Sequence, residues 1–382
     1  MLPSMKIIDR YLLRQFTKTF LICFLSLLGL YVVFDAFTNL ESFLRIADKQ
    51  GGLAKVLGQY YAFHAILFFD RTVGFVNLAA AMFTVTWIQR HNELVALMAA
   101  GISRVRVVIP VVGAVVVVIV LAALNRELLI PRYRDELSRK PSDLAGDAAK
   151  PFSPQYDEET DVFHRGESAA ASRQEIVKPN FRLPPALDLY GKDISARTAS
   201  YKEPQGNRPR GYLFTGVDRP KDIGRQPSLL LEGRPVVITP RDAPDWLQPD
   251  QCFVASGVSF EQLTKGQAWR EFSSTAQLIR GLHNRSLDFG GNIRVTIHAR
   301  IAQPLLDLTL LFLGLPLVMT RESRNVFIAM GLSAGVTLAF MVFVLALARL
   351  GSIYAISPAL AVWVPLMIFV PAAVELAISI TK

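Results

Sequence analysis

The sequence has little cysteine: Cys23 and Cys252 are the two thiols in a chain of 382 residues. Cys23 lies inside an apolar run and Cys252 lies far away in a polar region, so a disulfide framework or a cysteine-built zinc site is excluded. We expect both thiols to be ordinary packing residues.

Motifs that carry chemistry are also missing. The chain contains no Walker A sequence, no HExxH, no GxSxG and no cluster of histidines. These absences argue against ATP hydrolysis by the P-loop route and against the common hydrolase sites. We therefore expect no catalytic site, and no metal or cofactor held by this chain.

The chain carries an excess of positive charge, with a formal net charge of +9. The basic residues are dispersed, however, and no basic segment is interleaved with aromatic residues as in a nucleic-acid-binding module. We therefore expect no nucleic-acid partner. The excess is attributed to membrane surfaces and to a basic domain outside the membrane.

Long hydrophobic runs are abundant, and 51% of the residues are hydrophobic. An apolar helix of about 20 residues spans the hydrocarbon core of a bilayer. The runs predict six transmembrane helices, at residues 19–37, 72–89, 105–124, 301–320, 326–348 and 358–380.

The distribution of charge sets the expected orientation. Residues 1–18 form a basic, amphipathic elbow, and positive charge favours the cytoplasmic side. Together with a basic turn at Arg321 and Arg324, this predicts that both termini are cytoplasmic. Asp70 and Arg71 interrupt the hydrophobicity, so we expect them at the outer boundary, with the preceding segment on the outer surface.

Residues 126–294 differ in composition from the rest, being charged, polar and rich in proline. Short β-like runs such as GYLFTGV and RPVVITP alternate with turn signals, which predicts an antiparallel β-sandwich or β-jelly roll. Its first part, about residues 137–175, has the composition of a flexible linker. The expected fold class is an α-helical polytopic membrane protein with an inserted external β domain, divided at 1–125, 126–294 and 295–382.

The loop between the second and third spans predicts a helix at about residues 90–101. Leu94, Leu97 and Met98 recur at i, i+3 and i+4, and Gly101 followed by Ser103 is a stop signal. Such a helix suits docking onto a cytoplasmic protein, or it lies on lipid with arginines at phosphates. The helical pattern alone does not separate the two interpretations.

Glu93 favours docking onto a protein. It lies on the predicted helix close to Arg90, and a lone carboxylate gains nothing from an anionic leaflet. It would gain from an arginine or lysine of a protein partner.

The layout of the chain and three of its segments, DRYLLRQFTKTF, RHNELVALMAAGIS and IHARIAQPLLDLTLLFLGLPL, are similar to those of a known family. They resemble the LptF/LptG family of permeases, which with the ATPase LptB extract lipopolysaccharide from the inner membrane of Gram-negative bacteria. The resemblance implies an LptB-like ATPase dimer, a second permease that is identical or paralogous, and an LptC/LptA-like periplasmic bridge. It also implies an inner-membrane location with the large domain in the periplasm, and ATP used by the partner subunit.

By resemblance, the loop helix is a coupling helix seated in a groove of the ATPase, with Glu93 as the acidic contact. The residues assigned to this coupling role are Arg90, Glu93, Leu94, Leu97 and Gly101.

The resemblance also implies a lipid-binding cavity, but one familiar feature differs. In some family members lysines near the outer end of the first span meet lipid phosphates, whereas this chain has Asp35 there and no lysine until Lys49. The candidates for holding an anionic headgroup are instead Arg45, Arg71 and Arg300, which flank apolar runs at the predicted outer boundary. The alternative for each is snorkelling at the interface or pairing with a neighbour such as Asp70.

Two other functions stay open from the residues alone. A membrane-anchored binding or assembly protein would use the β domain, with the spans as anchor. An ion-driven transporter would need ionisable residues deep in several spans, where Asp35 and Asp307 are the candidates. An anchor has no need of a capped helix with an embedded carboxylate, which favours the transporter subunit.

Overall fold

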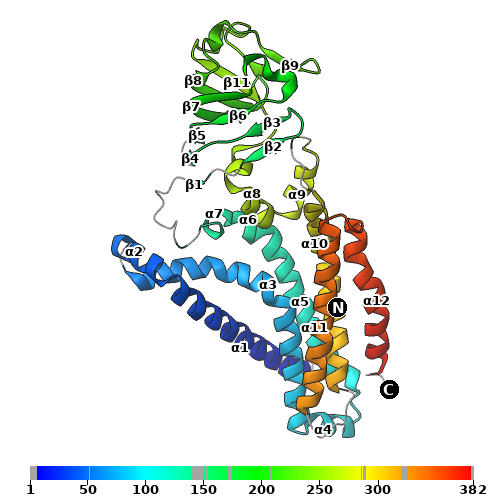
Figure 1. Cartoon of the computed structure of the whole chain (residues 1–382). Helices are drawn as coiled ribbons and strands as arrows, with labels where there is room; N and C mark the ends of the chain where they lie inside the picture. Colours follow the sequence, from blue (N-terminus) through cyan, green and yellow to red (C-terminus); the bar gives the residue numbers. More distant parts are fainter. Residues whose placement is uncertain are drawn as a thin grey trace. The chain divides into compact units, whose positions relative to one another are not determined.

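The computed structural model divides the chain into two compact units, one of residues 1–137 with 290–382 and one of residues 138–289. Figure 1 shows the first as a set of long helices and the second as mainly β-strands. The structure describes residues 7–50, 52–139, 141, 150–151, 154–170, 174–206, 208–284, 286, 290–319 and 326–379.

Six helices of the first unit are long and apolar enough to cross a membrane. This confirms the six-span interpretation. The helices are α1 Ile7–Thr38, α3 Leu53–Arg90, α5 Arg104–Leu124, α10 Gly290–Met319, α11 Val326–Ser352 and α12 Pro358–Ser379.

The N-terminal half differs from expectation in its helix boundaries. The segment expected to form a separate elbow is the first part of α1. The segment expected to lie on the outer surface is the first part of α3. Between α1 and α3 lies a short helix, α2 (Leu40–Gln50). Helix α3 runs through Asp70 and Arg71 without a break. Asp70 accepts a hydrogen bond from Arg126 Nε at 2.8 Å, and the two side chains are 14% and 16% exposed. Because its charge is paired within the bundle, Asp70 does not force the helix to end.

The boundary of the β unit also differs from the expected residues 126 and 294. After α5 the chain continues through a π-helical turn and two short helices, the last of which ends at Leu137. At the other boundary, α10 begins at Gly290. Buried Asn125 supports the π turn by donating from Nδ2 to the carbonyl of Ile66 at 3.0 Å. The three elements are η1 Asn125–Leu129, α6 Ile130–Arg132 and α7 Arg134–Leu137.

Close packing within the first unit centres on α10. In its most apolar 18-residue window 61% of residues are buried, against 6% in α1 and 17% in α11. A Cβ added at Gly314 would lie 2.7 Å from the side chain of Leu78, so Gly314 leaves room for a side chain of α3 against α10. Among the described residues, α1 and α11 keep large apolar faces exposed.

The second unit is an eleven-stranded sheet in which every pairing of named strands is antiparallel. Its main order is β1-β4-β5-β7-β8-β11-β10-β9, with a branch in which β6 pairs with β7 and β3 joins β6 to β2. The strands are β1 Lys150–Pro151, β2 Gln155–Asp157, β3 Val162–His164, β4 Ser168–Ala170, β5 Glu175–Val177, β6 Asn180–Arg182, β7 Asp193–Lys202, β8 Gly211–Arg219, β9 Leu229–Leu231, β10 Arg234–Ile238 and β11 Gln251–Ala255.

The branch arises at β7, a ten-residue strand that pairs with two short strands, each along a different part of its length. Residues 193–195 pair with β6, and residues 198–200 pair with β5. Strands β1 to β4 lie within residues 137–175, so the expectation of a flexible linker is wrong for these residues. The remaining residues of that range include 142–149 and 171–173, which are outside the described part of the chain.

Aromatic rings fill the centre of the sheet. Phe181 packs edge-on against Tyr212 and Phe214, with ring centroids 5.5 Å and 4.9 Å away, and His164 packs against Phe181 at 4.4 Å. All four side chains are fully buried. The Tyr212 hydroxyl is satisfied by donating to the carbonyl of Val258 at 2.9 Å.

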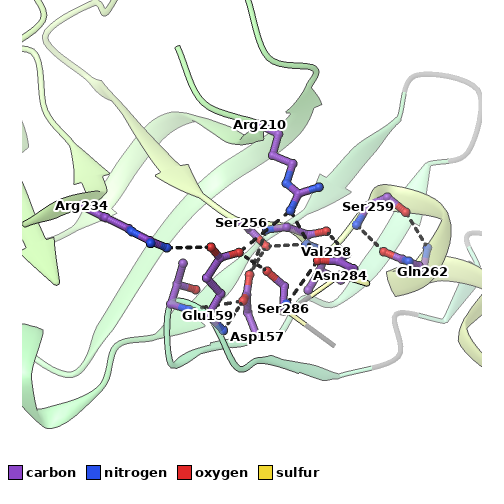
Figure 2. Close-up of polar contacts among 12 residues, drawn as sticks. Asp157, Glu159, Arg210, Arg234, Ser256, Val258, Ser259, Gln262, Asn284 and Ser286 are labelled. Atoms are coloured by element: carbon purple, nitrogen blue, oxygen red, sulfur yellow. Dashed lines mark hydrogen bonds and ion pairs between the residues drawn. The ribbon is translucent and has the colours of Figure 1, made fainter. Parts of the chain in front are cut away.

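A buried carboxylate fastens the start of the β unit to its end (Figure 2). Asp157 is fully buried and accepts from the backbone N–H of Glu159 at 3.0 Å and from the Ser256 hydroxyl at 2.6 Å. Ser286, close in sequence to the start of α10, donates to Glu159 Oε2 at 3.2 Å.

Two helices precede Ser286 in the chain, α8 Phe260–Phe272 and α9 Thr275–Leu282. Each begins with a capping box.

His164 should make the stability of the β unit depend on pH. Burial lowers its pKa to about 4 from the ordinary 6.5, although the nearby Asp157 charge acts in the opposite direction. The unfolded chain therefore takes up a proton before the folded chain does, so stability is lost as pH falls from 6.5 towards 4, by up to about 3 kcal/mol. The measurement is thermal unfolding of the full chain at several pH values, beside a His164→Gln variant. An equal pH slope in both proteins would contradict this role.

Candidate functional site

Helix α4, Glu93–Ala99, forms the turn between α3 and α5 (Figure 1). It is shorter than the expected helix at 90–101, because Asn92 adopts a left-handed conformation with φ 57° and separates α4 from α3. Asparagine tolerates this conformation better than most residues. Arg90 is consequently the exposed last residue of α3 and does not belong to α4.

The end of α4 is fixed by backbone hydrogen bonds at the glycine that the sequence indicated. Gly101 has φ +81° and donates its N–H to the carbonyl of Met98 at 2.9 Å. Ile102 donates to the carbonyl of Leu97 at 3.0 Å, which completes a Schellman motif. Ser103 then caps α5, accepting from the N–H of Arg106.

The inner face of α4 is apolar and buried. Leu94 is 7% exposed and packs with Leu12 of α1, Ile88 of α3 and Val107 of α5. Leu97 packs, partly buried, against the same cluster. Leu94 and Leu97 therefore hold α4 to the bundle and do not face outward, which differs from their expected role as partner contacts.

The outer face of α4 carries a different pair of apolar residues. Val95 is 63% exposed and Met98 is 39% exposed, three positions apart on one side of the helix. The expectation that Met98 shares the face of Leu94 and Leu97 is wrong, since Met98 is exposed beside Val95. Val95 was missed because Leu94 and Ala96, on either side of it, are also apolar.

Polar contacts tie the start of α1 to this turn. The Tyr11 hydroxyl lies 3.1 Å and 3.0 Å from the two carboxylate oxygens of Glu93, to which it donates. Arg106 Nη2 lies 2.7 Å from Asp9 Oδ2. Glu93, which was expected to meet a partner, thus has a hydrogen-bond donor within its own chain.

The three arginines expected at a headgroup site have different surroundings. Arg45 lies on α2 and pairs with Glu41 at 3.0 Å, with both side chains largely exposed. Arg71 is exposed on α3, and Arg300 is half-buried on α10. Charged residues in the surroundings of Arg300 include Arg126, Glu127 and Asp70.

Arg126 is a cation that the sequence reasoning missed. It is the partner of Asp70 and lies in the surroundings of Arg300. The signal that selected the three arginines also applied to it, since it follows the third apolar run.

Most of the chain matches a known family. Residues 10–167 and 231–379 match the model of the family described as lipopolysaccharide export system permease LptF/LptG. The chain belongs to the LptF/LptG family. A comparison with curated proteins gave no match.

Membership in the LptF/LptG family implies a permease role in lipopolysaccharide export. The matched ranges contain α4 and the six long helices except the first three residues of α1, 7–9. With these helices, membership indicates a multi-pass protein of the inner membrane. Residues 168–230, which include β4 to β8, lie outside the match.

Replacing Leu94 by alanine should loosen α4, because a buried leucine truncated to alanine costs about 2–5 kcal/mol. Hydrogen exchange of the α4 amides in the full chain measures this effect. Val95→Ala is the matched control, and it should leave exchange nearly unchanged because Val95 is exposed. Equal exchange in the two variants would contradict the assigned faces.

Proposed function

We propose that this chain is the permease subunit of an ABC transporter that extracts lipopolysaccharide, or a related anionic lipid, from the inner membrane toward the periplasm. A separate LptB-like ATPase dimer supplies the energy, and this chain holds neither ATP nor another cofactor. The observation that carries the proposal is α4. It is a short helix fixed on its inner side by Leu94, ended by Gly101, and exposing Val95 and Met98 between two spans.

The exposed pair gives the docking contact a specific form. Val95 and Met98 would enter an apolar groove of the ATPase, while Arg90 would meet an acidic group at its rim. Methionine suits such a contact because its flexible side chain fits irregular apolar surfaces. A protein that used its spans as an anchor would not need this helix, which is why the transporter is favoured.

The uncovered faces of α1 and α11 support a second permease subunit. Their apolar windows are the least buried among the described spans, and α11 carries small residues in the run MGLSAGV. Small residues let helices approach closely in a membrane. A second copy or a paralogue would cover these faces and complete a lipid cavity between the two subunits.

The cavity would hold the anionic headgroup by arginine. Arg45, Arg71 and Arg300 remain our candidates, and Arg126 joins them because it lies close to Arg300 and the Asp70 charge. The β unit would pass the lipid to an LptC/LptA-like periplasmic bridge.

Charge on the exposed face of α4 should disrupt docking. Val95→Asp with Met98→Asp would place carboxylates in an apolar contact, weakening retention of the ATPase by about tenfold or more. Co-purification from membranes measures retention, and the unfolding temperature shows that the permease is intact. Leu230→Asp, at an exposed apolar residue of the β unit, is the control. Undiminished co-purification with the double variant would rule out α4 as the docking site.

The orientation proposed is cytoplasmic termini with a periplasmic β unit. It is supported by the basic start of α1, including Arg10 and Arg14, whereas the basic turn at Arg321 and Arg324 is outside the described residues. Single cysteines at exposed Asp218 and at Met98, in a chain without Cys23 and Cys252, test it. In cells that produce this chain without the ATPase, an impermeant maleimide should label position 218 in intact spheroplasts, and position 98 after the membrane is opened. The reverse order would invert the topology.

A further inference from the structure

We infer that the first turns of α1 belong to the coupling device, with Tyr11 and Asp9 as positioning residues that carry displacement of α4 directly to α1. This inference rests on the proposed function, because it describes how force applied to α4 would reach a membrane helix. Its structural part, a latch between α1 and the turn, concerns this chain alone.

The latch has two polar contacts made by one turn of α1. Tyr11 donates to Glu93, at the start of α4, and reaches both carboxylate oxygens within 3.1 Å. Asp9 pairs at 2.7 Å with Arg106, in the first turn of α5. Helix α1 is therefore joined to α4, before Gly101, by one contact and to α5, after Gly101, by the other.

An apolar cluster lies beside the polar contacts. Leu12 is fully buried against Leu94, Ile88 and Val107, and Ile8 packs at the edge of the same cluster. Ile8 and Leu12 are one helical turn apart, so the same face of α1 supplies both. Displacing α4 without α1 would expose this cluster, which favours joint movement.

The remainder of α1 is loosely covered by its own chain, since 6% of its apolar window is buried. A helix of 32 residues is roughly 48 Å long and transmits movement along its axis. Near its other end, Asp35 accepts from the Tyr61 hydroxyl at 2.8 Å. Helix α1 is thus joined to α4 and α5 at one end and to α3 at the other.

The role of Glu93 follows from this geometry. The Glu93 carboxylate joins α4 to α1 by accepting the hydrogen bond from the Tyr11 hydroxyl. Its effect on coupling therefore depends on Tyr11. The alternative is that Glu93 serves as a contact to a basic residue of the ATPase, in which case loss of the Tyr11 hydroxyl would have no effect on coupling. Tyr11→Phe separates the two roles, because it leaves Glu93 in place.

The first experiment needs no partner. Spin labels at the exposed positions Arg14 and Met98, in a full chain lacking Cys23 and Cys252 and placed in lipid nanodiscs, report the distance from α1 to α4. Tyr11→Phe should raise the population of separated conformers about threefold to tenfold. Tyr61→Phe removes a tyrosine–carboxylate bond at the far end of α1 and should leave this distance unchanged. A distribution unaffected by Tyr11→Phe would overturn the latch.

The second experiment uses the transporter assembled with its ATPase. Tyr11→Phe should lower the lipid released per ATP hydrolysed several-fold, with assembly and ATP hydrolysis retained, as expected when one hydrogen bond is lost from a mechanical link. Asp9→Arg and Arg106→Asp should each lower this ratio, and the double exchange should restore it. An unchanged ratio for Tyr11→Phe, or no rescue by the exchange, would overturn the coupling role.

The two experiments fail separately. If no ATPase accompanies the wild-type chain, the proposed function is wrong, and the distance measurement still decides whether the latch exists. If the ATPase is retained and the distances do not respond to Tyr11→Phe, docking stands and the latch is rejected.

Discussion

Helix α10 is the element on which the rest of the membrane unit depends, because α3, α11 and α12 all pack against it. Glycines leave room for side chains where α10 meets α3: a Cβ at Gly314 would meet Leu78, and a Cβ at Gly74 would meet Asp307. Ser333 of α11 donates to the carbonyl of Gly314 at 3.0 Å. The apolar windows of α1 and α11 are the least buried among the described spans, so their outer faces remain for lipid or for another subunit.

The spans could be predicted from the sequence because hydrocarbon offers no hydrogen-bond partners, so an apolar run of sufficient length has to be helical. The end of α4 could also be predicted, since Gly101 tolerates a positive φ that other residues disfavour. The pair of Asp70 with Arg126 could not, because it joins residues 56 positions apart. Strands β1 to β4 were missed for a related reason: two or three residues are too few to show an alternating pattern.

The faces of α4 show where a residue pattern is insufficient. Leu94 and Val95 are both apolar, and tertiary packing decides that Leu94 is buried and Val95 exposed. Asp35, near the end of α1, shows the same limit. Its carboxylate accepts from Tyr61 and Asn39, so tertiary contacts give it the role of joining α1 to α3.

The central claim is that α4 docks onto an ATPase and is not simply an interfacial helix lying on lipid. A photo-crosslinking amino acid at position 98, in the full chain in living cells, tests it most directly, because Met98 is on the exposed face. The account predicts an adduct with a protein that contains a Walker A sequence, identified by mass spectrometry, and a much weaker adduct from buried position 94. Adducts with lipid alone, or equal adducts from the two positions, would contradict it.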